Sequence, residues 1–379
     1  MSNEKYSVII DGKRSPIVLK NSPLLGMRSD DLAAIVIKDL VSKNSEISKS
    51  FVEDLVVGCA FPEGPQGMLM AKGISILADL PTETAAKIVN RFCGSSMDAA
   101  HQVSQAVQAG DYEYGIAAGV EDMFSVPMGG FNPSFNPTLY ENEYYIGMGE
   151  TAENLAQELD ISRDDQEAFA VHSHEKALAA ILAGRFDNEI VPIEFNGTTV
   201  SVDEGPREPN LEKIKSLSPA FDADGSITAA TSSPVSLGAA ALLITSNTLA
   251  EESGVKANFK IKSRAVAGVD WRVMGSGPLP ATEKALVKAG LSMNDIDAIE
   301  LNEAFAAQSL YVIRKGGWNM DKINLNGGAI ALGHPLGCSG ARLLVTLMNV
   351  MEQNDKTHGL ATMCIGSGQG IATIIERIN

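Results

Sequence analysis

The sequence predicts an α/β fold with a largely parallel sheet. Short β-rich runs alternate with helical stretches over the first 120 residues, and the same alternation returns after Ala257. The two alternating parts look alike and are separated by a block rich in proline and glycine. At 379 residues with 45% apolar content, the chain can bury a large core, and its length indicates two or three domains.

The first alternating part contains three expected strands and two expected helices. The β-rich runs are residues 6–10, 54–57 and 85–89. Helical periodicity predicts helices near residues 30–41 and 70–77, between these runs. Strands that alternate with helices in this way are typical of parallel pairing.

The middle of the chain, from residue 123 to about residue 231, has a different composition. Turn-forming residues gather at its start, at Pro127, Gly129, Gly130, Pro133, Pro137, Gly147 and Gly149. A helix is expected near residues 162–183. We therefore expect residues 122–233 to form an inserted, loop-rich domain.

The last part repeats the α/β alternation. Strands are expected at residues 259–269 and 297–301, a helix is opened by residues 280–282, and a strand–helix–strand set ends the chain. We expect an N-terminal half made of residues 1–121 with 234–257, and a C-terminal half made of residues 258–379.

The two halves share a pattern that predicts a duplication. Cys93-Gly-Ser opens a helix and is followed 26 residues later by Gly119-Val-Glu, while Cys338-Ser-Gly opens a helix and is followed 26 residues later by Cys364-Ile-Gly. Internal repeats of this kind indicate a structural unit that occurs twice. The alternative is coincidence, since small residues are common at such turns.

Composition excludes several classes of function. A formal charge of -17 argues against binding nucleic acid, which needs clustered Lys and Arg. Residues 1–10 carry a single cationic side chain, Lys5, and lack an apolar core of signal-peptide length, while no later stretch approaches ~18 uninterrupted apolar residues. The four cysteines form no C-x-x-C pair, so we expect no zinc site and a cytoplasmic, reducing environment.

Cys93 is the first candidate for chemistry. It follows an apolar strand and precedes a helix that is expected to end at Gly110. Backbone amides at a helix N-terminus favour a thiolate, so we expect the pKa of Cys93 to lie below the ordinary value of ~8.5. The alternative interpretation is a buried structural cysteine.

Two further clusters carry polar groups on glycine-rich turns. Residues 325–340 place five glycines around His334, which can serve as a base or as a donor to an oxyanion; a surface histidine is the alternative. Cys364 leaves an apolar run and is followed by Gly366, where a thiol could protonate a carbon; a plain turn is the alternative. The glycine spacing fails the dinucleotide fingerprint, because position 371 is isoleucine.

Asn302 and Glu303 form the fourth cluster. They follow an apolar strand, and open α/β sheets bind ligands at the carboxyl ends of their strands. The alternative interpretation is that Asn302 caps a helix, since asparagine is a favoured cap residue.

Together the four clusters resemble the signatures of the thiolase family. The matching motifs are Cys93-Gly-Ser, Asn302-Glu-Ala-Phe-Ala, Gly333-His-Pro-Leu-Gly and Cys364-Ile-Gly-x-Gly-Gln-Gly, in this order, and the likeness covers the whole chain. The resemblance implies the thiolase fold: two similar βαβαβαββ halves in five layers, α-β-α-β-α, with an inserted loop domain that holds coenzyme A.

The resemblance also implies roles for the candidate residues. Cys93 would attack the 3-keto carbon of a 3-ketoacyl-CoA after His334 takes its proton, and Cys364 would protonate the departing enolate. His334 and a water held by Asn302 would bind the enolate oxygen, and the amides of Cys93 and Gly366 would bind the tetrahedral oxygen. No metal and no permanently bound cofactor is expected, because coenzyme A is a substrate.

Weaker correspondences concern coenzyme A. Ser233 matches a serine near the pantetheine, and Met148 matches a residue that lines its tunnel. The chain departs from the family at Ser218, where many members carry an arginine near the adenine, and at Leu237, where aspartate is common. Both departures concern the binding of coenzyme A rather than the chemistry.

Within the family, the chain looks most like the thiolase (β) subunit of bacterial fatty-acid oxidation complexes, on residues 323–342 and 359–365. Gly147 stands where biosynthetic acetoacetyl-CoA thiolases commonly have histidine, which favours the degradative branch. The resemblance implies at least a homodimer and a multifunctional enoyl-CoA hydratase/3-hydroxyacyl-CoA dehydrogenase subunit as a partner.

Other interpretations stay open at this point. One is an acetoacetyl-CoA thiolase that works in the biosynthetic direction, and another is a silent acyl-CoA-binding paralogue. A ketoacyl synthase would replace the second cysteine with His or Asn, so Cys364 argues against it. His172 and His174 are two residues apart on an expected helix and point to different faces, so we interpret them as solvated side chains rather than metal ligands.

Overall fold

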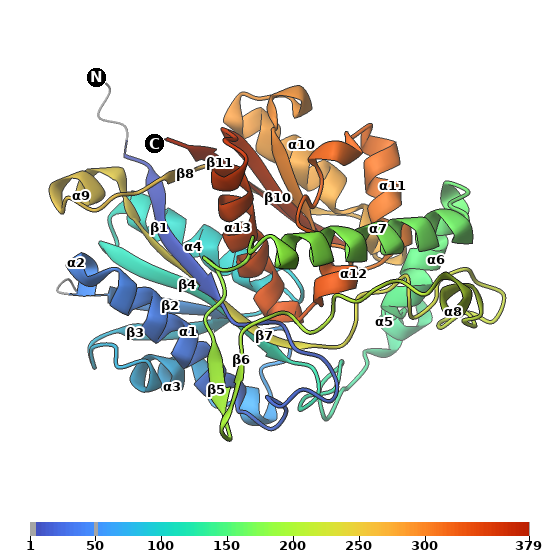
Figure 1. Cartoon of the computed structure of the whole chain (residues 1–379), viewed down its shortest axis with the longest axis horizontal. Helices are drawn as coiled ribbons and strands as arrows, with labels where there is room; N and C mark the ends of the chain where they lie inside the picture. The colour runs from blue at the N-terminus through green and yellow to red at the C-terminus, as the bar shows by residue number, and fades with distance from the viewer. Residues whose placement is uncertain (1–4, 49–51, 379) are drawn as a thin grey trace.

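The structure is a computed structural model that describes residues 5–48 and 52–378. Nine strands follow one hydrogen-bonded order, β3-β2-β4-β7-β1-β8-β11-β10-β9, and β5 and β6 form a separate hairpin (Figure 1). The strands are β1 (Ser7–Arg14), β2 (Val52–Gly58), β3 (Ala85–Val89), β4 (Tyr114–Asp122), β5 (Ile193–Phe195), β6 (Thr198–Val200), β7 (Leu237–Ser246), β8 (Phe259–Gly268), β9 (Ala298–Leu301), β10 (His358–Ile365) and β11 (Gln369–Arg377).

Thirteen α-helices connect or cover these strands in the described part of the chain. They are α1 (Ser29–Lys43), α2 (Ser45–Ser48), α3 (Met70–Leu77), α4 (Ser95–Ala109), α5 (Pro137–Glu141), α6 (Met148–Glu158), α7 (Arg163–Leu182), α8 (Leu211–Lys215), α9 (Asn247–Glu252), α10 (Pro278–Ala289), α11 (Ala306–Gly316), α12 (Ala329–Leu332) and α13 (Leu336–Gln353). None of these helices combines the length and the apolar character that crossing a membrane requires.

The two halves of the chain have the same strand topology. In the first half β2 is parallel to β3 and β4, and β7 is antiparallel to β4 and β1. In the second half β9 is parallel to β10, and β11 is antiparallel to β10 and β8. A parallel bridge between Ile299 and Ile323 occupies the place that β3 has in the first half. Among the described strands, β1 and β8 alone pair across the two halves, through two residue pairs.

The layers follow from the side-chain alternation along the strands. On β7, Leu242 and Ile244 pack in one core with α4 and α13, whereas Ala241 and Leu243 pack in a second core with α1 and α3. A third core joins the opposite face of β10 and β11 to α10 and α11. The order is therefore α1/α3, sheet, α4/α13, sheet, α10/α11, which confirms the expected five layers (Figure 1).

Glycines allow α13 to approach both α4 and β4 closely in the central layer. A methyl group added to Gly340 would lie 2.4 Å from the backbone nitrogen of Met97, and one added to Gly119 would lie 2.3 Å from the carbonyl oxygen of Gly337. A larger residue at either position would force its side chain against the backbone of the neighbouring element. The central layer thus depends on small residues at these crossings.

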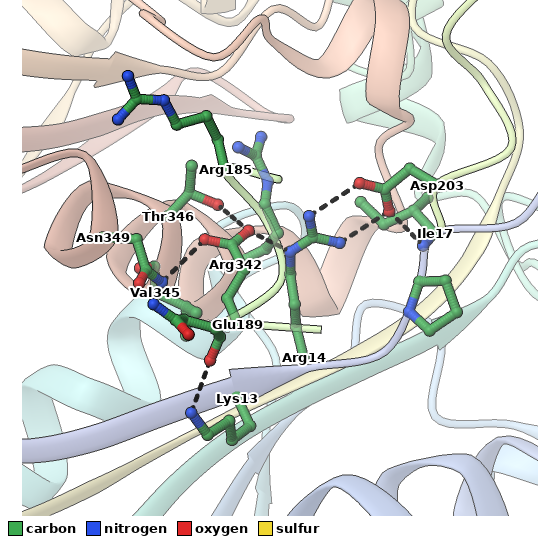
Figure 2. A network of polar contacts seen from close by, with 12 residues as sticks. Lys13, Arg14, Ile17, Arg185, Glu189, Asp203, Arg342, Val345, Thr346 and Asn349 are labelled. Atoms are coloured by element: carbon green, nitrogen blue, oxygen red, sulfur yellow. Dashed lines mark hydrogen bonds and ion pairs between the residues drawn. The ribbon is translucent and has the colours of Figure 1, made fainter. Parts of the chain in front are cut away.

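A buried ion network ties the middle of the chain to both halves. Arg14 on β1 donates to Asp203 at 2.7 and 2.8 Å and to Glu189 at 2.6 Å (Figure 2). Thr346 and Asn349 of α13 donate to the same Glu189. Burial alone would lower the pKa of Arg14, but the charges of Asp203 and Glu189 outweigh it and raise the pKa, so the guanidinium stays charged.

Most predicted elements agree with the structure. The helix at Met70–Leu77 and the strand at Ala85–Val89 have the predicted bounds, and the expected helix at 162–183 is Arg163–Leu182, capped by Ser162. The prediction of a largely parallel sheet was wrong, because β7 and β11 run antiparallel to both neighbours. The helix predicted to open at residues 280–282 begins at Pro278, which suits proline as a first helical residue.

The close approach of α4 and α13 yields a stability prediction. Gly340→Ala should lower the free energy of unfolding by about 1–3 kcal/mol, because the methyl group overpacks the central layer. Gly73→Ala is the matched control: Gly73 also lies inside a helix but has no atom near its would-be methyl group, so it should stabilise by roughly 0.4–1 kcal/mol. Urea unfolding of both variants checks this, and equal effects would contradict it.

Candidate active site

Cys93 lies on a tight turn between β3 and α4. Phe92, immediately before it, has a left-handed backbone with φ of 42°, which is unusual for a residue other than glycine. The amide of Phe92 bonds to the side chain of Asn90 at 2.9 Å, and the amide of Gly94 bonds to the carbonyl of Arg91 at 3.0 Å. Backbone strain of this kind gathers at functional sites.

The protonation state predicted for Cys93 was wrong. Helix α4 begins at Ser95 with Gly94 as its cap, so Cys93 lies just before the helix, as expected. However, burial raises the pKa of the thiol to about 12, although the amides of Gly366 and of Cys93 itself donate toward the sulfur and oppose this shift. Loss of solvent outweighs these hydrogen bonds, so the resting group is a thiol.

The hairpin between β10 and β11 brings Gly366 to Cys93. Ser367 and Gly368 both have positive φ, at 66° and 80°, and this reverses the chain. A methyl group on Gly368 would lie 2.4 Å from the carbonyl oxygen of Val269, so the turn also needs a small residue there. The amides of Gly366 and Cys93 therefore converge on one point, the sulfur of Cys93.

Cys364 is fully buried at the end of β10, on the same hairpin. Burial raises the pKa of its thiol, and the nearby Cys93 raises it further. Cys364 precedes by two residues the Gly366 amide that points at the sulfur of Cys93, so the same hairpin serves both thiols. Both are protonated at neutral pH, so either can donate a proton.

His334 is held at both ring nitrogens and at its backbone. Its amide donates to Ser236 at 3.0 Å, Nδ1 lies 2.6 Å from Ser339 Oγ, and Nε2 lies 3.3 Å from the side-chain nitrogen of Asn302. Burial lowers the pKa of His334 to about 3, and the charge of Arg342 contributes. The imidazole is therefore neutral and can accept a proton, and it is not the surface histidine that remained an alternative.

Asn302 lies just past β9, facing His334. Its amide bonds to Thr362 of β10 at 3.0 Å, and its side-chain oxygen is buried without a hydrogen-bond partner among the described residues. The next helix, α11, is capped by Phe305, so the interpretation of Asn302 as a helix cap was wrong. This oxygen beside His334 can accept a hydrogen bond.

Two buried carboxylates hold the loop of His334, and neither was assigned a role from the sequence. Glu121 accepts from the amide of Gly337 at 2.8 Å, and Glu303 accepts from Ser173 at 2.6 Å and from Asn324 at 2.8 Å. Burial raises the pKa of both carboxyls, and hydrogen bonds oppose this shift. The sequence feature that could have identified these two carboxylates is an acidic residue at the end of an apolar strand in each half.

Met148 and Ser233, the two residues predicted to contact coenzyme A, lie beside different segments of the site. Met148 begins α6, and its sulfur would lie 3.4 Å from a methyl group built on Gly366, so it borders the site. Ser233 donates its amide to Ala304 at 3.0 Å, which places it beside the segment after Asn302. No contact joins Ser233 to either thiol in the described residues.

Within residues 5–48 and 52–378, no group of three or more His, Cys, Asp and Glu side chains is arranged to hold a metal ion. His172 is exposed and lies 3.7 Å from Glu175. The interpretation of His174 as solvated was wrong, because it is 5% exposed and its pKa is lowered to about 4 by burial and by Arg207.

Sequence comparisons agree with this geometry. Residues 7–248 match the family model of the thiolase N-terminal domain, and residues 255–377 match that of the thiolase C-terminal domain. Three curated relatives are named 3-ketoacyl-CoA thiolase. That of Marinomonas sp. (strain MWYL1) is 49% identical over 99% of both chains, and that of Shewanella loihica is 48% identical over 98% of this chain and 100% of its own. That of Alcanivorax borkumensis is 47% identical over 99% of both chains. The chain belongs to the thiolase family of acyltransferases.

Proposed function

We propose that this protein is a degradative 3-ketoacyl-CoA thiolase of fatty-acid β-oxidation, which uses coenzyme A to cleave a 3-ketoacyl-CoA into acetyl-CoA and a shortened acyl-CoA. The observation that carries the proposal is the convergence of two backbone amides on the sulfur of Cys93, next to the hairpin that carries the Cys364 thiol. The neutral imidazole of His334 supports it, because it faces Asn302 at the end of β9, the strand that pairs with the Cys364 strand. The full-length relatives that carry this name support it.

The first step forms an acyl-enzyme. His334 Nε2 takes the proton of Cys93, and the sulfur attacks the 3-keto carbon of the substrate. The amides of Cys93 and Gly366 receive the oxyanion, and each such donor contributes about 10²–10³-fold to the rate. The bond between C2 and C3 then breaks, which leaves the acyl group on Cys93 and the electron pair on the acetyl-CoA enolate.

The second step protonates the enolate and the third releases the acyl group. The imidazolium of His334 and a water held by Asn302 bind the enolate oxygen, while Cys364 gives its proton to carbon. The Cys364 thiolate then takes the proton of a second coenzyme A thiol, while the His334 imidazolium keeps the proton that it will return to Cys93. That thiol attacks the acyl group, and the sulfur of Cys93 leaves and regains its proton.

We assign residues 122–233 as the domain that holds coenzyme A, with Met148 and Ser233 as contacts, between a half made of 1–121 with 234–257 and a half made of 258–379. Support comes from β7, which begins at Leu237 and pairs with β4 and β1 of the first half. It also comes from the Phe221 ring, which packs on Phe305 beside Ser233 with 5.6 Å between ring centroids.

We further propose that the protein is a homodimer in the cytoplasm and that a hydratase/dehydrogenase subunit is a further partner. Strand β3 lies at the edge of the described sheet, and exposed apolar side chains lie nearby in the sequence: Met68, Leu69, Ile76 and Leu77. Both features support self-association. All four cysteines are free thiols, as expected in a reducing compartment.

Cleavage assays on Cys93→Ala test the function. The enolate absorbance of the substrate follows its cleavage. With added coenzyme A, the wild type should consume both acetoacetyl-CoA and 3-ketohexadecanoyl-CoA. The activity of the variant should fall at least about 10³-fold, because the variant lacks the thiol that carries the acyl chain. Cys338→Ala, which removes a buried thiol outside the site, should keep the activity.

The outcome also distinguishes the alternatives. Preference for the long chain supports β-oxidation, while preference for acetoacetyl-CoA would favour a biosynthetic acetoacetyl-CoA thiolase. If well-folded wild type cleaves neither substrate, the enzyme proposal fails and the silent acyl-CoA-binding paralogue replaces it.

The pKa of Cys93 predicts the pH dependence of its alkylation. Because burial raises the folded-state pKa to about 12, the thiolate fraction should grow about tenfold per pH unit through the neutral range without a plateau. The rate of iodoacetamide labelling at Cys93 measures this, with Cys93→Ala to subtract the other cysteines. A rate that levels off below about pH 8 would show a thiolate in the resting enzyme and contradict it.

Light scattering after gel filtration tests self-association. The expected mass is that of two chains, and Ile76→Lys on the exposed side of α3 should shift the protein toward one chain. A wild-type mass of one chain would contradict the dimer.

A further inference from the structure

We infer that Ser339 is a positioning residue for His334: its hydroxyl fixes the imidazole in the tautomer that carries hydrogen on Nδ1 and leaves the lone pair on Nε2. The inference rests on the proposed function in one respect, because His334 acts there as the base for Cys93. Ser339 itself touches neither the thiols nor Asn302 in the described contacts.

The argument depends on the single hydrogen of the Ser339 hydroxyl. Oγ lies 2.9 Å from the carbonyl oxygen of Pro335 and 2.6 Å from His334 Nδ1. A carbonyl oxygen can only accept, so the hydroxyl hydrogen is used on Pro335. The contact with Nδ1 then requires a hydrogen on the ring nitrogen, with Ser339 Oγ as acceptor.

The groups around this contact are held in place. Ser339 lies in the first turn of α13, its amide also donates to Pro335 at 3.0 Å, and its side chain is buried. The backbone of His334 is fixed by the hydroxyl of Ser236. The ring can therefore reach the other tautomer only if the Ser339 hydroxyl turns away from Pro335 and gives up that buried hydrogen bond.

The opposite side of the ring agrees with this assignment. The side-chain nitrogen of Asn302 lies 3.3 Å from Nε2, and an amide N–H pointed there needs a lone pair on the ring. Nε2 is thus ready to take the proton of Cys93. Once it has done so, the imidazolium still donates from Nδ1 to Ser339, so no proton passes through Ser339.

A neutral hydroxyl differs from a carboxylate in the same place. A carboxylate would stabilise the imidazolium and raise the pKa of His334, whereas Ser339 orients the ring without adding charge. This fits a base that must return its proton during the same turnover.

The test compares Ser339→Ala with two other variants. In Ser339→Ala the Nδ1 hydrogen has no acceptor among the described residues, and the ring can adopt the wrong tautomer, so kcat for thiolysis should fall about 10²-fold with an unchanged KM. Ser339→Thr keeps the hydroxyl and should recover most of the activity. Ser104→Ala is the matched control, because it removes an equally buried hydroxyl, 2.6 Å from Ser7 Oγ, in α4.

Nitrogen NMR of the resting enzyme provides a readout that a purely structural role would not change. The chain has five histidines, and His334→Gln assigns the signal of His334. The wild type should show a protonated Nδ1 and an unprotonated Nε2, and Ser339→Ala should show a mixture of tautomers. A wild-type ring protonated on Nε2, or a Ser339→Ala enzyme with wild-type kcat, would overturn the inference. If wild type shows no thiolysis at all, the proposed function fails, but the NMR result still decides the tautomer.

Discussion

The contact between α4 and α13 is the constraint on which the rest of the structure depends. Both helices are buried between the two halves of the sheet, and both begin at the same end of the central layer. Cys93 lies just before α4 and His334 just before α13, and the N-terminal turns of the two helices contact each other, so their packing places both residues at the same end of the central layer. Glycine at the crossings is what allows the approach, since any side chain at Gly340 would meet the backbone of the other helix.

Burial then sets the chemical state of the reacting groups. The environment raises the pKa of both thiols and lowers that of His334, so the site at rest contains neutral groups only. Negative charge develops there only during the reaction. Backbone amides can stabilise it, because the turn at Gly366 and the strained backbone at Phe92 already orient them. The acidic side chains Glu121 and Glu303 lie outside this set of groups, where they accept hydrogen bonds from the segment around His334.

Local pattern was enough to predict much of the fold and to single out the candidate site residues. The apolar runs and their turn residues located the helix at Met70–Leu77 and the strand at Ala85–Val89, because burial and periodicity act over a few residues. The role of Glu121 could not be predicted, because its partner Gly337 lies on another element. The role of Ser339 could not be predicted either, because it depends on the direction of one hydroxyl hydrogen. The antiparallel neighbours of β7 and β11 were missed because strand direction depends on which strands meet in space.

The sequence by itself determined which reactive groups the protein has, their order along the chain, and the glycine-rich turns that carry them. Their protonation states were decided only by the tertiary structure. A helix N-terminus alone would lower the pKa of Cys93, but the final hairpin of the chain packs against this turn and removes water from the thiol. Desolvation depends on everything that surrounds a group, and most of what surrounds Cys93 comes from segments far away in the sequence.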